Sequence, residues 1–259
     1  MIGMCEESDV ESPPVVGRQE TVDALIVKSA RPDFVAVRRG FVQQVRGSAL
    51  LPGPLHLLVG HHDERGLDLY LLTRLLASHT PFEAQRPAGV WARALGLSGP
   101  SGPAAVSRAW RRLADLRLVS RDRRGRTACV RVLLEDGSGK PFVQCGAGGD
   151  PYFKIPLEYW RNGWYRKLHL PAKAMLLVAL SLPDDFYLPT KMAEPWYGVS
   201  ADTAQRGLAN LQERGILRRT GSRKSAPRAA QGWTMEYRYQ LMPPFRLHRA
   251  VPQGPDVHP

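Results

Sequence analysis

The chain has 259 residues, 43% of them apolar, which suffices for one large core or two small ones; typical domain lengths of roughly 100–200 residues favour two. The formal net charge of +12 favours a polyanionic partner such as nucleic acid. No stretch reaches the ~18 uninterrupted apolar residues of a membrane span, and the acidic start is no signal peptide, so we expect a cytoplasmic protein without a membrane partner. Three widely separated cysteines exclude a disulfide framework.

The first half of the chain begins with an acidic segment, residues 1–30, which we interpret as a mobile leader. The apolar run from Leu67 then predicts a buried helix. Two further helices are expected in "PAGVWARALGLS" and "VSRAWRRLADLRLVSR", followed by a basic two-stranded ribbon. The glycine-rich residues 141–150 are expected to form a linker.

The second half repeats this order. Lys173 to Leu182 is nearly all apolar, which predicts a helix buried on most sides. A short helix is expected in "PTKMAEPW", and the strict alternation from Trp233 to Leu241 predicts a strand. Residues 244–259 are expected to form a Pro-rich tail.

The stretch "WYGVSADTAQRGLANL" predicts a tight turn that leads into a helix. Gly198 supplies the positive φ that such a turn needs, and Ser200 is a good N-cap. Ala204, Leu208 and Leu211 fall on one face of the helix, which leaves polar residues on the other. This pattern is typical of a helix whose first turn contacts something outside the protein.

One unit occurs twice in the chain. Aligning Pro87 with Pro189 places Gly96 on Gly198 and Ser98 on Ser200. The first copy then inserts "GPSG", after which Arg108 lies on Arg206, Leu113 on Leu211 and Leu118 on Ile216. Three helices and a ribbon per copy predict a mainly α protein with small β-wings, of the α+β class, built from two tandem winged helix-turn-helix domains at residues 31–140 and 151–243.

The second helix of a helix-turn-helix enters the major groove and presents its N-terminal residues to base edges. Polar residues off the apolar stripe are therefore candidates for contact with double-stranded DNA: Ser107, Arg108, Arg111 and Arg112 in the first copy, and Ser200, Ala201, Thr203, Gln205, Arg206 and Asn210 in the second. The ribbons add candidates for phosphate binding: Arg121, Arg123, Arg124 and Arg126, then Arg218, Arg219, Arg223, Lys224 and Arg228.

A second interpretation stays open, because runs of charge are usually solvated and winged helices also serve in protein interaction. On this interpretation the chain is an adaptor that assembles a protein complex and contacts nucleic acid only nonspecifically. Two copies, two basic ribbons and the overall charge favour DNA binding instead. A homodimer is compatible with either function, and no small-molecule ligand is predicted.

Enzymatic and metal chemistry is disfavoured. His56, His61, His62, Asp63 and Glu64 could in principle hold a metal ion or serve a strand-nicking tyrosine such as Tyr70. Their spacing is not that of rolling-circle nickases, so we interpret the segment as a solvated loop before a helix. We expect no enzyme activity, no cofactor and no metal.

The segments "YFKIPLEYWRNGW", "LPAKAMLLVALSL" and "YLPTKMAEPWYGVSADTAQRGLANLQERGIL" resemble tandem winged-helix proteins of bacterial plasmids and mobile elements, especially replication initiators, and related actinobacterial helix-turn-helix regulators. The resemblance covers roughly residues 33–241. It implies that an extended segment with a phenylalanine leads into each unit, as in "DFVAVRRGFV" from Asp33. It also implies that two pseudo-symmetric domains bind successive major-groove faces of an operator or an origin.

Overall fold

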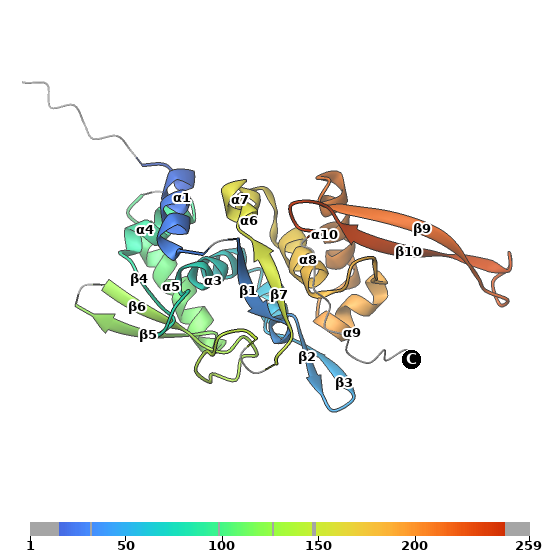
Figure 1. Ribbon diagram of the computed structural model, residues 1–259, viewed down its shortest axis with the longest axis horizontal. Helices are drawn as coiled ribbons and strands as arrows, with labels where there is room; N and C mark the ends of the chain where they lie inside the picture. The colour runs from blue at the N-terminus through green and yellow to red at the C-terminus, as the bar shows by residue number, and fades with distance from the viewer. Residues whose placement is uncertain (1–15, 32, 98, 126, 147–148, 247–259) are drawn as a thin grey trace, which may run out of the picture.

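A computed structural model of the chain describes residues 16–246 except 32, 98, 126, 147 and 148 (Figure 1). Its first half contains α1 (Arg18–Ser29), β1 (Phe34–Arg38), η1 (Arg39–Phe41), β2 (Gln43–Arg46), β3 (Ala49–Pro52), α2 (Leu55–Gly60), α3 (Glu64–Leu76), β4 (Glu83–Gln85), α4 (Ala88–Ala94), α5 (Gly102–Asp115), β5 (Val119–Arg124) and β6 (Thr127–Val132). Its second half contains β7 (Tyr152–Pro156), α6 (Glu158–Arg161), α7 (Trp164–Lys167), α8 (Leu170–Ser181), β8 (Phe186–Tyr187), η2 (Thr190–Met192), α9 (Ala193–Tyr197), α10 (Ala201–Glu213), β9 (Leu217–Ser225) and β10 (Trp233–Leu241).

Helices and small antiparallel sheets make up the molecule, in agreement with the expected α+β class. The two halves share an order of elements, because α3, β4, α4, α5, β5 and β6 are followed later by α8, β8, α9, α10, β9 and β10. Their three-stranded sheets also have the same strand order, β4-β6-β5 and β8-β10-β9. Gly96 and Gly198, which the sequence alignment pairs, both have positive φ, +70° and +63°.

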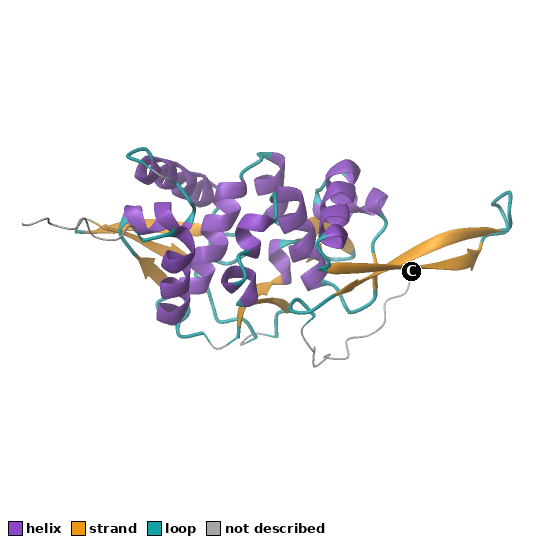
Figure 2. Cartoon of the chain, turned by 90° about the horizontal axis from the view of Figure 1, so that it is seen from above, coloured by secondary structure: helices purple, strands orange, loops and turns teal. Residues whose placement is uncertain are grey.

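The two halves are joined by a strand pair that the sequence pattern does not predict. β1 and β7 pair antiparallel with Phe34 opposite Pro156 and Arg38 opposite Tyr152. These strands lie in the two phenylalanine-containing segments, so the halves meet through corresponding parts of their chains. Val37 and Phe153 are buried there, and one hydrophobic core runs through both halves. Figure 2 shows the helices gathered centrally, with strands projecting at both ends.

The N-terminal segment differs from the expected mobile leader. Residues 18–29 form α1, in which Val22, Leu25 and Ile26 are buried at the i, i+3, i+4 spacing of an amphipathic helix. Arg18 Nε donates to the carbonyl of Ala94 at 3.0 Å, which ties α1 to the end of α4. The leader interpretation was wrong for residues 18–29 because it extended the acidic character of residues 6–11 over a segment with balanced charge and a short apolar stripe. Residues 1–15 lie outside the described residues.

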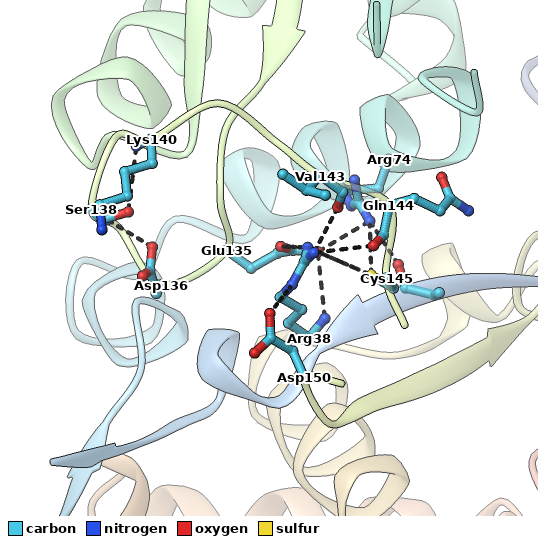
Figure 3. A network of polar contacts seen from close by, with 11 residues as sticks. Arg38, Arg74, Glu135, Asp136, Ser138, Lys140, Val143, Gln144, Cys145 and Asp150 are labelled. Atoms are coloured by element: carbon cyan, nitrogen blue, oxygen red, sulfur yellow. Dashed lines mark hydrogen bonds and ion pairs between the residues drawn. The ribbon is translucent and has the colours of Figure 1, made fainter. Parts of the chain in front are cut away.

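The expected linker is also packed where the structure describes it. Figure 3 shows the network of polar contacts that involves this segment. Arg38 Nη2 donates to the carbonyl of Val143 at 2.6 Å, and Arg38 Nε lies 3.3 Å from Asp150 Oδ2. The Phe142 ring is buried, with the Arg74 guanidinium carbon 4.0 Å from its centroid.

A buried ion network centres on Glu135, whose side chain is fully buried. Glu135 Oε2 accepts from Arg38 Nη1 at 2.9 Å, and Oε1 lies 3.1 Å from Arg74 Nη2. Arg74 also donates to the carbonyl of Ala36 at 2.7 Å. The network therefore links β1, α3 and the segment after β6.

A second buried cation connects α8 to α3. Lys173 Nζ lies 2.7 Å from Asp68 Oδ1 and 2.8 Å from Glu64 Oε1, and the lysine side chain is 1% exposed. Glu64 also accepts from the backbone N–H of Leu170, at the start of α8. This network joins α3 in the first half of the chain to α8 in the second half.

We expect Glu135→Gln to lower the free energy of unfolding by about 3–5 kcal/mol, because two buried guanidinium groups lose their shared counter-charge. Urea denaturation of the purified variant measures the change. The matched control is Glu158→Gln, which weakens an exposed contact with Arg161 of 3.9 Å and should cost under about 1 kcal/mol. Equal losses in the two variants would contradict a structural role for the Glu135 network.

The Asp68 carboxyl should impose a pH dependence on stability. Burial raises its pKa to about 6, although the Lys173 ammonium opposes this shift. Folded Asp68 thus holds a proton more tightly than the unfolded chain, so its contribution to the free energy of unfolding is favourable below about pH 4 and is lost as pH rises to about 6. The difference between wild type and Asp68→Asn, measured by denaturation across this range, should fall with pH. A difference that stays constant or rises would contradict the assignment.

Candidate nucleic-acid interface

Helix α10 begins as the sequence predicts. Gly198 ends α9 in the left-handed region, and the Ser200 hydroxyl accepts a hydrogen bond from the backbone N–H of Thr203 at 3.3 Å. Asp202 in the first turn lies 3.0 Å from Arg206 Nη2, and both side chains are largely exposed. Exposed pairs of this kind contribute only about 0.2–1 kcal/mol, so a ligand can compete for the guanidinium.

The two faces of α10 have different surroundings. Ala204, Leu208 and Leu211 are buried, and Gly207 lies so close to α8 that an added Cβ would be 2.4 Å from the carbonyl oxygen of Pro171. The opposite face carries the candidate residues predicted from sequence: Gln205 and Arg206 are exposed, Ser200 is exposed, and Ala201, Thr203 and Asn210 are half-buried. Packing against α8 and the core therefore holds one side of α10 in place, and its polar side remains accessible to a ligand.

The turn before α10 is held from the other half of the molecule. A Cβ on Gly198 would lie 2.6 Å from the Cβ of His56 and 3.0 Å from that of Pro52. Gln43 Nε2 also donates to the carbonyl of Trp196 at 3.2 Å. The β2–β3 hairpin, which has no equivalent between β7 and α8, and α2 thus support α9 and the start of α10.

Helix α5 occupies the corresponding place in the first half. It begins at Gly102, the last residue of the inserted "GPSG", and buries Val106, Ala109 and Trp110. Arg108 and Arg111 are exposed and Ser107 is half-buried, so these candidates can meet a ligand. Ser98, the residue aligned with Ser200, lies outside the described residues.

Arg112 differs from the other candidates on α5 because a carboxylate of another helix already holds its guanidinium. Its Nε and Nη2 lie 2.6 and 2.5 Å from the two oxygens of Asp63, the N-cap residue of α3. This bidentate bond raises the pKa of Arg112. Its structural role is to fasten α5 to α3, and sequence spacing alone gave no sign of the pairing.

The β5–β6 hairpin lies beside α5. A groove of about 460 Å³ separates them, and its lining includes Ser107, Arg121 and Arg123 among the predicted residues, together with the unpredicted Arg86. Arg124 is engaged at 3.0 Å by Glu83 of β4. Hydrogen bonds from Arg131 and from the Cys129 thiol lower the pKa of Glu83, which keeps it charged as a partner. Arg126 lies outside the described residues.

The β9–β10 hairpin is longer and projects away from the helices (Figure 1). Its basic candidates Arg218, Arg219, Arg223, Lys224 and Arg228 are all exposed. Two of them have polar partners across the hairpin, Arg218 with Gln240 at 2.5 Å and Lys224 with Glu236 at 3.1 Å. Arg219 and Arg223 instead lie over the rings of Tyr237 and Trp233, each at 4.5 Å.

The histidine-rich segment does not assemble a site. His56 Nδ1 contacts the carbonyl of Gly53 at 2.7 Å, Asp63 caps α3, and Glu64 contacts Lys173. Tyr70 is fully buried, which removes it from contact with a DNA strand. Within the described part of the chain, no group of three or more His, Cys, Asp or Glu side chains could hold a metal ion.

No protein-family model, curated protein or solved structure matches this chain. Over the described residues, no helix has the length and apolar character required to cross a bilayer.

The Arg112 assignment predicts a stability effect. Arg112→Ala should lower the free energy of unfolding by about 1–3 kcal/mol, because a hydrogen-bonded charge pair that joins two helices is lost. Arg108→Ala, one helical turn earlier and exposed, should change it by less than about 0.5 kcal/mol. Urea denaturation of both variants tests the difference, and equal stability would show that Arg112 is as free as Arg108.

Proposed function

We propose that this protein binds double-stranded DNA sequence-specifically through two tandem winged helix-turn-helix domains, as a transcription regulator or a replication initiator of a plasmid or mobile element. The carrying observation is that each half sets a helix with an exposed polar face, α5 or α10, beside a basic antiparallel hairpin. In this arrangement the polar face of the helix contacts base edges in the major groove, and the basic hairpin beside it contacts the phosphates of the DNA backbone.

The chemistry of the two helices supports distinct contributions. On α10, Gln205, Arg206 and Asn210 are side chains that can pair with base edges, Arg with guanine and Gln or Asn with adenine. On α5, Arg108 and Arg111 supply charge for phosphate or guanine. The second helix is therefore assigned the larger share of sequence discrimination.

The fixed relation between the halves favours a bipartite target. The β1–β7 pairing and the Lys173 network join the two units directly. Rigidly joined units bind two half-sites at one spacing, whereas units on a free linker would tolerate several. Selection from a random duplex library should therefore return a two-part motif with a constant gap.

Salt dependence and single substitutions test the proposal. With the selected duplex, the logarithm of the binding constant should fall against the logarithm of salt concentration with a slope of about −5 or steeper, as expected for six or more neutralised phosphates. Arg206→Ala should reduce discrimination between the selected and a scrambled duplex by about 1–3 kcal/mol, whereas Arg223→Ala should weaken both alike. Fluorescence anisotropy measures each value.

The matched control is Arg161→Ala, an exposed arginine on α6 outside the proposed interface. It should change neither affinity nor discrimination. A flat salt slope together with equal affinity for all duplexes would contradict the proposal and favour the adaptor function. Loss of affinity in Arg161→Ala equal to that in Arg223→Ala would show that only overall charge matters.

A further inference from the structure

The outer part of the β9–β10 hairpin has an apolar and aromatic side whose Trp233, Met235 and Tyr237 side chains the duplex-binding proposal does not use; its two arginines, Arg219 and Arg223, are shared with that proposal. Residues opposite each other in an antiparallel pair share a face. The register places Trp233, Met235 and Tyr237 of β10 on the same face as Arg223 and Gly221 of β9. Arg219, two residues before Gly221 on β9, lies on this face as well. We name the set Trp233, Met235, Tyr237, Arg219 and Arg223 the aromatic face of the hairpin.

This face lies beyond the support of the core. β8 pairs with β10 only at Arg238 and Tyr239, so the hairpin is two-stranded from Tyr237 outward. At its base, Tyr239 is buried and stacks on Phe186. Further out on the same strand face, the next two side chains, Tyr237 and Met235, are 40% and 39% exposed. The exposed apolar surface is therefore continuous along the projecting part.

The aromatic face also carries planar cations. The guanidinium carbons of Arg219 and Arg223 lie 4.5 Å from the ring centroids of Tyr237 and Trp233. Neither guanidinium forms an ion pair with a carboxylate among the described residues, in contrast to Lys224 on the opposite face. Residues 217–241 as a whole contain six basic residues and one acidic residue. The surface is thus complementary to a polyanion that also offers flat apolar groups.

We infer that the aromatic face is a second nucleic-acid site that binds unpaired bases of single-stranded DNA. Bases inside a duplex have both faces covered by neighbours, whereas unpaired bases can stack on rings and guanidinium planes. Successive side chains on one strand face are about 6.8 Å apart, twice the base rise of about 3.4 Å, so a base can enter between them. The inference rests on the proposed function only in assuming that DNA is the nucleic acid bound.

Gly221 contributes to the shape of this site. A Cβ there would lie 2.8 Å from Met235 Cε and 3.2 Å from Tyr237 Cε1. The glycine therefore lets the Met235 and Tyr237 side chains lie across β9. Both side chains therefore occupy the space over Gly221, between Arg219 and Arg223 on β9.

The experiment compares three probes by fluorescence anisotropy at one salt concentration. They are oligo-deoxythymidine about 20 nucleotides long, which exceeds a typical single-strand site of about 4–16 nucleotides, an abasic strand of equal length, and a duplex of equal length. The wild-type protein should bind the thymidine strand at least about tenfold more tightly than the abasic strand. Equal affinity for these two strands would overturn the inference, because phosphates alone would then explain binding.

Three variants locate the site. Met235→Ala/Tyr237→Ala should weaken binding of the thymidine strand at least about tenfold while duplex and abasic affinities change less than about threefold, since no charge is removed. Arg219→Lys/Arg223→Lys keeps the charge and loses the guanidinium planes, so it should act in the same direction. Thr220→Ala/Thr234→Ala, on the opposite face, is the matched control and should change nothing.

The outcomes separate this inference from the proposed function. A protein without duplex discrimination that still prefers the thymidine strand would refute the proposed function and leave the aromatic face assigned. Equal effects of aromatic-face and opposite-face variants would overturn the inference whatever happens with duplex DNA. Circular dichroism checks that each variant is folded, and the lysine pair keeps the test decisive if the alanine pair unfolds.

Discussion

The antiparallel pairing of β1 with β7 is the contact on which the arrangement of this molecule depends. It brings corresponding segments of two similar halves into one ladder and buries Val37 and Phe153 between them. The Lys173 network adds charge pairs between the halves that lose their compensation if the halves separate, whereas the Glu135 network holds β1 against α3 within the first half. The two helices proposed to contact DNA are consequently held at one separation.

The support of the second candidate helix crosses the boundary between the halves. The β2–β3 hairpin and α2 of the first half contact the turn at Gly198, where a side chain would meet His56 and Pro52. The first half thus acts partly as a scaffold for the second, while its own helix α5 is fastened to α3 by Arg112 and Asp63. The two halves are therefore supported differently, and α10 also has a more varied polar surface than α5.

The basic hairpins also differ between the halves. Figure 1 shows them at opposite ends of the molecule, with β9–β10 the longer. The shorter hairpin lies against a groove beside α5, and its Arg124 is already paired with Glu83. The longer hairpin has the aromatic face on one side, and on the other side basic residues that are paired with polar side chains across the hairpin. Two hairpins at corresponding places in the order of elements therefore have different surface chemistries.

The sequence by itself determined the local structure: the turn at Gly198, the Ser200 cap, the β10 alternation and the repeated order of helices, because each depends on neighbouring residues or on simple periodicity. Only the tertiary structure decided which charges are free. Arg112 and Arg124 fell in the same basic runs as Arg108 and Arg123, yet they are paired with Asp63 and Glu83, which lie far away in the sequence. The packing of α1 and the β1–β7 ladder likewise depend on distant partners, and a linear pattern holds no information on which distant groups meet.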